Sequence, residues 1–273
     1  MIQSNNWANP SMAGAQEIAE MASALEERGR ALDQQQINSA LISKLAPTPG
    51  DHLIEVGCGS GLLCRLMAPM VSPGGQITGL DISPEIITFA QNYAMNTGLA
   101  DLIQWSTGKA EFLPFKDMSF DSALAARLLL HVSTPESVLK ELKRVVRIGG
   151  KVVVMDWDFE TVVVDHPDRA LTRRVLHWRC DHYGGNNWSG RQLLRHMKAA
   201  GFSTLEGIPF VSVARNAKDS LTLSLFRSAQ VARDGGEITS SEHDAWVAEI
   251  NSALTADRFF ASIVYFIVSG VKV

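Results

Sequence analysis

The stretch LIEVGCGSG, residues 53–61, decides the fold. Three apolar residues and one acidic residue are followed by glycine at alternate positions, Gly57, Gly59 and Gly61. Glycines so placed let the backbone turn sharply from a strand into a helix and approach a ligand closely. A nicotinamide-binding turn has the spacing G-x-G-x-x-G, and here Leu62 stands where the third glycine would fall. The spacing favours a ligand without a pyrophosphate, although a tight turn that binds nothing stays open.

Strand and helix candidates alternate on both sides of this turn. Strands are expected over 52–57, 76–82, 102–108, 120–129 and 151–159, and helices over 60–70, 83–98 and 133–146. An apolar, Val/Ile-rich strand after each helix is typical of a parallel sheet covered on both faces. Further on, 167–185, 189–202, 218–232 and 240–254 read as helices, and 203–214 and 258–273 as strands. One long helix-permissive stretch, 12–45, precedes the first strand.

The composition narrows the class of function. The 273 residues carry a formal net charge of −4 and no dense run of Lys or Arg, which argues against a nucleic-acid partner. Cys58, Cys64 and Cys180 show no CxxC spacing, so neither a disulfide framework nor a structural zinc site is expected. The opening residues lack the basic and apolar regions of a signal peptide, and no run reaches the ~18 apolar residues of a membrane span. We expect a cytoplasmic protein with no membrane partner; the oligomeric state stays open.

Asp81 is the second candidate ligand-binding residue. It ends the second expected strand, about 20 residues after the glycines, where a carboxylate accepts hydrogen bonds from both hydroxyls of an adenosine ribose. The alternative is a carboxylate that caps the next helix, because the sequence DISPE also reads as a cap. Both roles are compatible if Ser83 does the capping.

From about residue 45 to 160 the chain resembles the class I S-adenosylmethionine-dependent methyltransferases, in particular the branch with the ubiquinone and menaquinone biosynthesis methyltransferases. The motifs LIEVGCGSG, GLDIS, GKAEFLPF with SFD, and LKRVVRIGGKVVV carry the resemblance, in that order. It implies an α/β fold with a Rossmann-like, seven-stranded, mostly parallel sheet, helices on both faces and an antiparallel terminal strand. It also implies S-adenosylmethionine as cofactor and S-adenosylhomocysteine as product.

The resemblance also implies the cofactor contacts. Glu55 is expected near the ammonium group, Asp81 on the ribose and Ile82 on the adenine, while the glycine turn surrounds the methionine part. The whole expected set is Glu55, Gly57, Cys58, Gly59, Ser60, Gly61, Asp81, Ile82, Ala110, Glu111 and Arg127. One departure concerns Lys109, where the family commonly has an Asp that accepts from the adenine amino group. Lysine only donates, so another residue is needed for that contact.

The chemistry asks little of the protein beyond alignment of the acceptor and exclusion of water. A base is needed only where the attacking atom loses a proton. The sequence AARLLLH, which ends at His131, has no clustered carboxylates and no Asn/Asp-Pro-Pro-aromatic motif. We therefore expect no metal, and no methylation of base or glutamine amines. His131 is the candidate general base; the alternative is a histidine packed for shape near a helix N-terminus.

The segment after the fifth strand is expected to cover the acceptor. Its candidate substrate residues are Asp156, Trp157, Trp178, His182 and Tyr183. For Trp178 a helix face against the core is the favoured alternative. Four arginines in the same region could attract an acidic acceptor, but a solvated helix face is the favoured interpretation of Arg169, Arg173, Arg174 and Arg179.

The expected organisation follows from these assignments. Residues 1–46 form an N-terminal helical cap and 47–273 a methyltransferase domain, with a cofactor-binding core at 51–160, an acceptor-covering segment at 161–200, a helical insertion at 216–257 and a terminal strand at 258–271. The cap and the insertion are expected to form a lid. The expected activity is metal-independent methyl transfer to a small organic acceptor. The alternatives are a macromolecular acceptor, a cofactor-binding protein that does not transfer methyl groups, and a nicotinamide-dependent Rossmann enzyme.

Overall fold

The computed structural model describes residues 14–182 and 184–273, and its centre is one twisted sheet. The strands are β1 (His52–Val56), β2 (Gln76–Asp81), β3 (Ile103–Thr107), β4 (Phe120–Ala126), β5 (Val146–Val164), β6 (Ser203–Ala214) and β7 (Ala261–Val271). Their order is β3-β2-β1-β4-β5-β7-β6. β1 to β5 pair in parallel, and β7 runs antiparallel to both β5 and β6. The expected seven-stranded, mostly parallel sheet with an antiparallel terminal strand is confirmed.

Helices cover both faces of this sheet. They are α1 (Ala15–Arg30), α2 (Leu32–Leu45), α3 (Leu62–Val71), α4 (Pro84–Asn96), α5 (Pro135–Val145), α6 (Arg169–His182), α7 (Ser189–Ala199), α8 (Ser220–Asp234) and α9 (Ser240–Thr255). Short 3-10 turns lie at Ala100–Leu102 and Leu129–His131. Within the described residues, no helix combines the length and the apolar character that a bilayer crossing requires.

The alternation of side chains along each strand divides the core between the two faces. Leu53 of β1 and Val153 of β5 face a cluster that includes residues of α2 and α3. Their neighbours Ile54 and Val152 face a second cluster with residues of α5 and α7. Because successive strand side chains point to opposite faces, apolar strands of this kind require helices on both sides.

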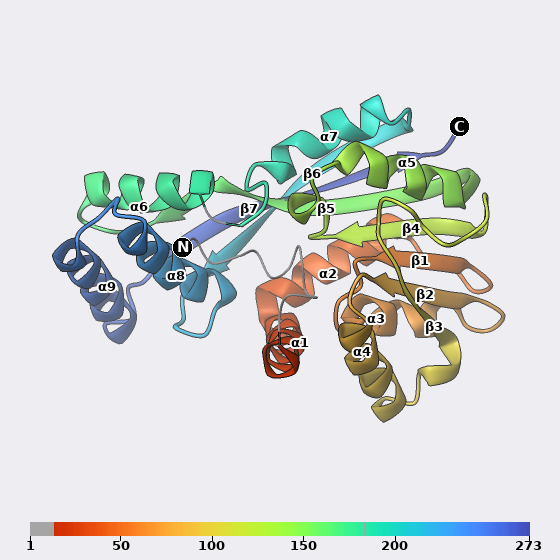
Figure 1. The fold of residues 1–273 in the computed structure, drawn as a ribbon, viewed down its shortest axis with the longest axis horizontal. Helices are drawn as coiled ribbons and strands as arrows, with labels where there is room; N and C mark the ends of the chain where they lie inside the picture. Colours follow the sequence, from red (N-terminus) through yellow and green to blue (C-terminus); the bar gives the residue numbers. More distant parts are fainter. Residues whose placement is uncertain (1–13, 183) are drawn as a thin grey trace.

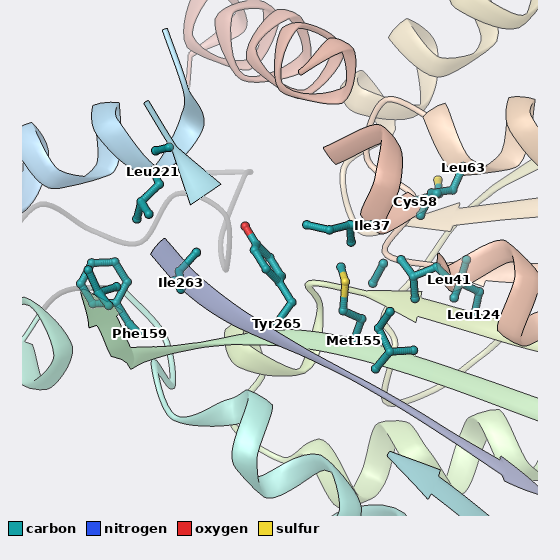
Figure 2. Packing of buried hydrophobic residues seen from close by; sticks show 14 of the residues in the cluster. Ile37, Leu41, Cys58, Leu63, Leu124, Met155, Phe159, Leu221, Ile263 and Tyr265 are labelled. Carbon is teal, nitrogen blue, oxygen red and sulfur yellow. The ribbon is translucent and has the colours of Figure 1, made fainter. Parts of the chain in front are cut away.

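The first cluster extends beyond the parallel part of the sheet. Figure 2 shows Tyr265 of β7 between two groups of buried side chains, with Ile37 and Met155 on one side and Phe159 and Ile263 on the other. The same cluster includes Leu221 of α8 and Ile250 of α9. The helices that follow β6 are therefore fixed to the rest of the molecule by a continuous apolar core.

The long strands β5 and β7 carry the chain past the ends of the parallel strands. In Figure 1, α6, α8 and α9 group toward the left, on the side where the arrowheads of β4 and β2 point, and α1 also lies there. Ligands of open α/β sheets bind at this carboxyl edge. The fold thus places helices from both ends of the chain around that edge.

Three expected elements differ from the structure. The strand expected over 120–129 ends at Ala126, because Arg127 is left-handed (φ +57°) and a 3-10 turn follows. The stretch 12–45 is not one helix, because Ala31 is extended (φ −65°, ψ 140°) and separates α1 from α2; residues 12 and 13 lie outside the described residues. The fifth strand is longer than 151–159 in both directions. It begins directly after α5, and its distal end pairs with β7 through Val163 and Val164, which satisfies backbone groups that a shorter strand would leave without partners.

Candidate active site

A cavity of about 1380 Å³ lies at the carboxyl edge of the sheet. Its walls come from the ends of β1, β2 and β4, the loops that follow them, α1, the end of α6 and its following loop, and α8. A pocket for a single drug-sized ligand is typically about 300–1,000 Å³. The cavity therefore has room for two ligands side by side.

The glycine turn after β1 forms one wall of this cavity. Gly57 (φ +75°) and Gly59 (φ +52°) both have left-handed backbone and line the cavity. The N–H of Gly57 donates to the carbonyl of Leu80 (2.7 Å), which ties the turn to the end of β2. Cys58 and Ser60, between and after these glycines, also line it. Left-handed backbone is costly for residues with a Cβ, so the glycines set the shape of this wall.

Gly61 serves a different purpose from the other two glycines. It is not among the residues that line the cavity. A Cβ at this position would lie 2.3 Å from Cη2 of Trp105 and 3.2 Å from the Cβ of Ala90. Gly61 therefore permits close packing of α3 against β3 and α4.

Asp81 lies beside the glycine turn at the end of β2. Its carboxylate accepts from the backbone N–H of Gly59 (2.9 Å) and from that of Ser83 (3.1 Å). Burial raises the pKa of Asp81, and the hydrogen bonds oppose this rise because they favour the ionised carboxylate. The hydroxyl of Ser83 accepts from the N–H of Ile86 (3.2 Å) and caps α4. Ser83 thus does the capping, and Asp81 faces the cavity.

Glu55 lies at the base of the turn and is 3% exposed. It accepts from the thiol of Cys64 (Sγ to Oε2, 3.0 Å). Burial raises its pKa to about 7, opposed by the Cys64 hydrogen bond and by the positive charge of Arg127. A carboxylate this deep in the protein is stabilised by a cation bound in the cavity.

The predicted adenine contacts lie together on the same side of the cavity. Ile82 follows Asp81 and is 41% exposed, and Ala110 and Glu111 approach from the loop after β3. Lys109 also lines this part.

Arg127 follows β4 in a left-handed conformation (φ +57°). Its N–H donates to the carbonyl of Met155 on β5 (2.6 Å), and its guanidinium donates to Oε1 of Gln34 on α2 (3.2 Å). Burial lowers its pKa, and the charge of Glu55 opposes that effect. The side chain lines the cavity next to the glycine wall, where the prediction places the methionine part of a cofactor.

His131 ends the 3-10 turn that follows and also lines the cavity. Burial lowers its pKa to about 4, and the positive charges of Arg28 and Arg179 lower it further. The imidazole is therefore neutral at physiological pH and able to accept a proton.

The predicted acceptor residues are not all brought to the cavity. Trp157 lines it. Asp156 is 0% exposed and lies behind the lining, where the hydroxyl of Ser189 donates to it and burial raises its pKa to about 7. The rings of Trp178 and His182 stack on each other (4.6 Å between centroids), and neither residue lines the cavity. Tyr183 lies outside the described residues.

Three arginines that line the cavity were missing from the predicted site. Arg28 comes from the last turn of α1, Arg179 from α6 and Arg227 from α8. The lining residues of α1, Glu17, Met21, Leu25 and Arg28, recur at helical spacing. That periodicity was the available signal, but nothing in it distinguishes a face toward a ligand from a face toward protein. For Arg179 the solvated-face interpretation is wrong, since this residue is 7% exposed.

The fold and the site define a class of protein, and comparison with known sequences agrees. Residues 54–154 match the family model described as a methyltransferase domain. Over these residues the chain is similar to a methyltransferase domain, and the glycine turn described above lies within the matched stretch.

Particular proteins are similar to this chain over different lengths. It is 31% identical over 231 residues to an uncharacterized 37.1 kDa protein in a transposon of Streptomyces fradiae, covering 84% of this chain and 65% of that protein. It is 36% identical over 111 residues to the 2-phytyl-1,4-naphtoquinone methyltransferase of Synechococcus elongatus, covering 41% of this chain and 48% of that enzyme. The chain therefore spans from about half to two thirds of the length of these relatives.

A solved structure shares the fold. Phosphoethanolamine N-methyltransferase 2 of Haemonchus contortus, in complex with S-adenosyl-L-methionine, superposes with a TM-score of 0.58 at 16% identity. The match covers 100% of this chain and 60% of that one. At this identity the likeness speaks for the fold alone.

Proposed function

We propose that the protein transfers a methyl group from S-adenosylmethionine to a small organic acceptor. The observation that carries the proposal is the composition of one cavity wall. The glycine turn, a buried carboxylate beneath it and a second carboxylate beside it converge on a space large enough for a nucleoside and an acceptor together. Bound there, the sulfonium supplies an activated methyl carbon that is open to in-line displacement.

The residues of this wall fit the proposed cofactor. Glu55 offers a buried negative charge to an ammonium group, and Arg127 offers a positive charge to a carboxylate. Each oxygen of Asp81 accepts one backbone N–H and retains a lone pair for a ribose hydroxyl. Ile82 presents an exposed apolar surface to the adenine ring. The side chain of Lys109 accepts no hydrogen bond, so Glu111 or a backbone carbonyl of this loop takes the adenine amino group.

His131 is proposed as the general base of the reaction. It is neutral at physiological pH and lies on the loop that separates the glycine wall from Trp157 and α8. A neutral imidazole takes the proton that an attacking hydroxyl, amine or carbon acid releases. In the same proposal α1 and α8 act as a lid that excludes water, and no metal ion takes part. Among the described residues, no group of three or more His, Cys, Asp or Glu side chains is placed to hold one.

The relatives suggest where the search for the acceptor should begin. One of them is named for a naphthoquinone substrate, so a quinone-like ring is one acceptor to try. The decisive experiment incubates the protein with isotopically labelled S-adenosylmethionine and a metabolite extract, followed by mass analysis of labelled products. A labelled small molecule supports the proposal, whereas label in RNA or protein fractions supports a macromolecular acceptor.

Calorimetry separates the remaining alternatives. Binding of S-adenosylmethionine and S-adenosylhomocysteine, with no binding of NAD, is expected. Binding of NAD alone would make the protein a nicotinamide-dependent enzyme. Cofactor binding without any labelled product, across extracts and candidate acceptors, would indicate a protein that binds the cofactor for another purpose.

A further inference from the structure

The part of the cavity lining that includes Arg28 and Trp157 holds hydrogen-bond donors that lack acceptors. Arg28 lines the cavity, and within residues 14–182 and 184–273 its guanidinium makes no hydrogen bond or ion pair. The indole Nε1–H of Trp157 is buried and has no acceptor among the same residues. The buried indole donor without an acceptor costs about 1–3 kcal/mol, and the half-buried Arg28 adds a charged donor beside it, so this part of the cavity is suited to a ligand that supplies acceptors.

Arg179 is held rigidly on the same side of the cavity. Its guanidinium stacks over the ring of Phe159 (4.6 Å to the centroid) and donates to Oδ1 of Asn187 (3.2 Å). The amide of Asn187 donates in turn to the carbonyls of Cys180 (3.1 Å) and Gly185 (3.3 Å). A guanidinium fixed in this way loses little side-chain entropy when it binds a ligand.

His131 shows that both arginines act on the same space. The charges of Arg28 and Arg179 both lower the pKa of its imidazole. Burial and the neighbouring charge of Arg127 lower the pKa of Arg28 itself to about 9, so the guanidinium remains charged at neutral pH. Both cations therefore act electrostatically on the candidate base, and the base is neutral.

The carboxylates that line the cavity lie elsewhere. Glu17 and Glu20 lie two to three turns earlier on α1, roughly 12–17 Å from Arg28 along the helix axis. Glu55, Asp81 and Glu111 belong to the glycine side. Among residues 14–182 and 184–273, Arg28 thus forms no ion pair with an acidic side chain of the lining.

We propose that the methyl acceptor carries a carboxylate or phosphate group, and that Arg28 and Arg179 bind this group beside His131. This inference rests on the proposed function. A planar guanidinium matches either oxyanion bidentately. The anionic group serves for binding, and a different atom of the acceptor receives the methyl group.

The proposal has a consequence for catalysis. An anion bound between Arg28 and Arg179 offsets their charges and favours the protonated form of His131. The acceptor would thereby make His131 a stronger base when it binds. The pKa of His131 should rise on binding of an anion to the cofactor-loaded protein, and NMR titration of the imidazole measures this shift.

The test uses matched pairs of small probes on protein saturated with S-adenosylhomocysteine, which occupies Arg127. Calorimetry compares benzoate and phenyl phosphate with benzamide and benzyl alcohol, and hexanoate with hexanamide, at fixed ionic strength. At least one anion is expected to bind tenfold or more tightly than its neutral partner. Tighter binding of benzoate than of phenyl phosphate would indicate a carboxylate on the acceptor, and the reverse order would indicate a phosphate.

Variants assign this preference to the two arginines. Arg28→Gln should weaken binding of the anion tenfold or more, without changing binding of the neutral partner or of S-adenosylhomocysteine. Arg30→Gln, an exposed change in the same turn of α1, is the matched control. Arg179→Gln is paired with Arg173→Gln on the exposed face of α6. If Arg179→Gln fails to fold, Arg28→Gln decides.

The outcomes separate this inference from the proposed function. If no anion binds more tightly than its neutral partner, or if Arg28→Gln leaves the preference intact, the inference is wrong while the methyltransferase proposal stands. If S-adenosylhomocysteine itself does not bind, the proposed function fails first.

Discussion

The two sides of the cavity differ in charge and in construction. The glycine side carries Glu55, Asp81 and Glu111 and is formed by the loops after β1, β2 and β3. The other side carries Arg179 and His131, from α6 and the turn after β4, and Arg28 of α1 lies between the two sides, since α1 packs against the glycine turn through Leu25. In the proposals above, the first side binds the hydroxyl and ammonium groups of the cofactor, with Arg127 for its carboxylate, whereas the second side binds an anionic group of the acceptor. The difference indicates that the two ligands are recognised by separate sets of residues.

The largest expected effect concerns the second side. His131→Ala should lower kcat about 10²- to 10⁴-fold, the usual contribution of a general base, and leave the dissociation constant of S-adenosylhomocysteine unchanged. Steady-state kinetics with the identified acceptor, together with calorimetry, measures both quantities. His177→Ala, on the exposed face of α6, is the matched control.

The pH profile checks the same assignment. Since burial and the two arginines lower the pKa of His131 to about 4, the neutral base is fully present above about pH 5 and is lost as the pH falls through about 4. Full activity of His131→Ala would leave this residue with a packing role only. The second side of the cavity would then bind the acceptor without supplying a base.

The next effect tests whether Gly61 has the packing role that separates it from Gly57 and Gly59. Gly61→Ala should destabilise the fold by about 2–4 kcal/mol, because its methyl group would overlap Trp105 and the backbone is left-handed (φ +74°). Gly98→Ala is the control, with φ +70° and no atom within 4 Å of the added Cβ; about 1 kcal/mol is expected there. Urea unfolding measures both. Equal losses for the two variants would show that Trp105 moves aside at little cost.

The same contrast explains what could be predicted from the sequence. The glycine turn, Asp81 and the alternation of strands and helices rest on signals within short stretches, and the structure places that turn and Asp81 at one edge of the sheet. The opposite side depends on which face of a helix meets the cavity. Arg179 and Arg173 belong to one helix with similar surroundings in the sequence, yet only Arg179 lines the cavity. Tertiary packing determines which of the two arginines lines the cavity, and no short stretch of the sequence carries that information.

A smaller effect is expected on the glycine side at Asp81. Asp81→Ala should weaken binding of S-adenosylhomocysteine by about 1–3 kcal/mol, the scale of lost charge-assisted hydrogen bonds. Asp101→Ala, an exposed change before β3, is the control. Calorimetry measures both, and thermal melting checks that the turn held by the Gly59 hydrogen bond remains folded. An unchanged dissociation constant would remove Asp81 from the cofactor site.

The smallest expected effect is the pH dependence that Glu55 gives to cofactor binding. Burial raises the pKa of this carboxyl group to about 7 in the free protein, and a bound ammonium group favours the ionised form. Binding must therefore release a proton below pH 7, so affinity for S-adenosylhomocysteine should rise by at most tenfold per pH unit from pH 5.5 to 7 and then level off. Glu55→Gln keeps the acceptor for the Cys64 thiol but removes the titrating group.

Calorimetry in two buffers of different ionisation enthalpy counts the released proton directly. The variant should bind more weakly at pH 7.5 than the wild type does and show a flatter pH profile, with any remaining slope assigned to Asp81, whose pKa burial also raises. Identical pH profiles for the two proteins would mean that the ammonium group lies away from Glu55. The acidic side of the cavity would then have to recognise its ligand through Asp81 and the backbone of the turn, because no charge beneath the glycines would take part.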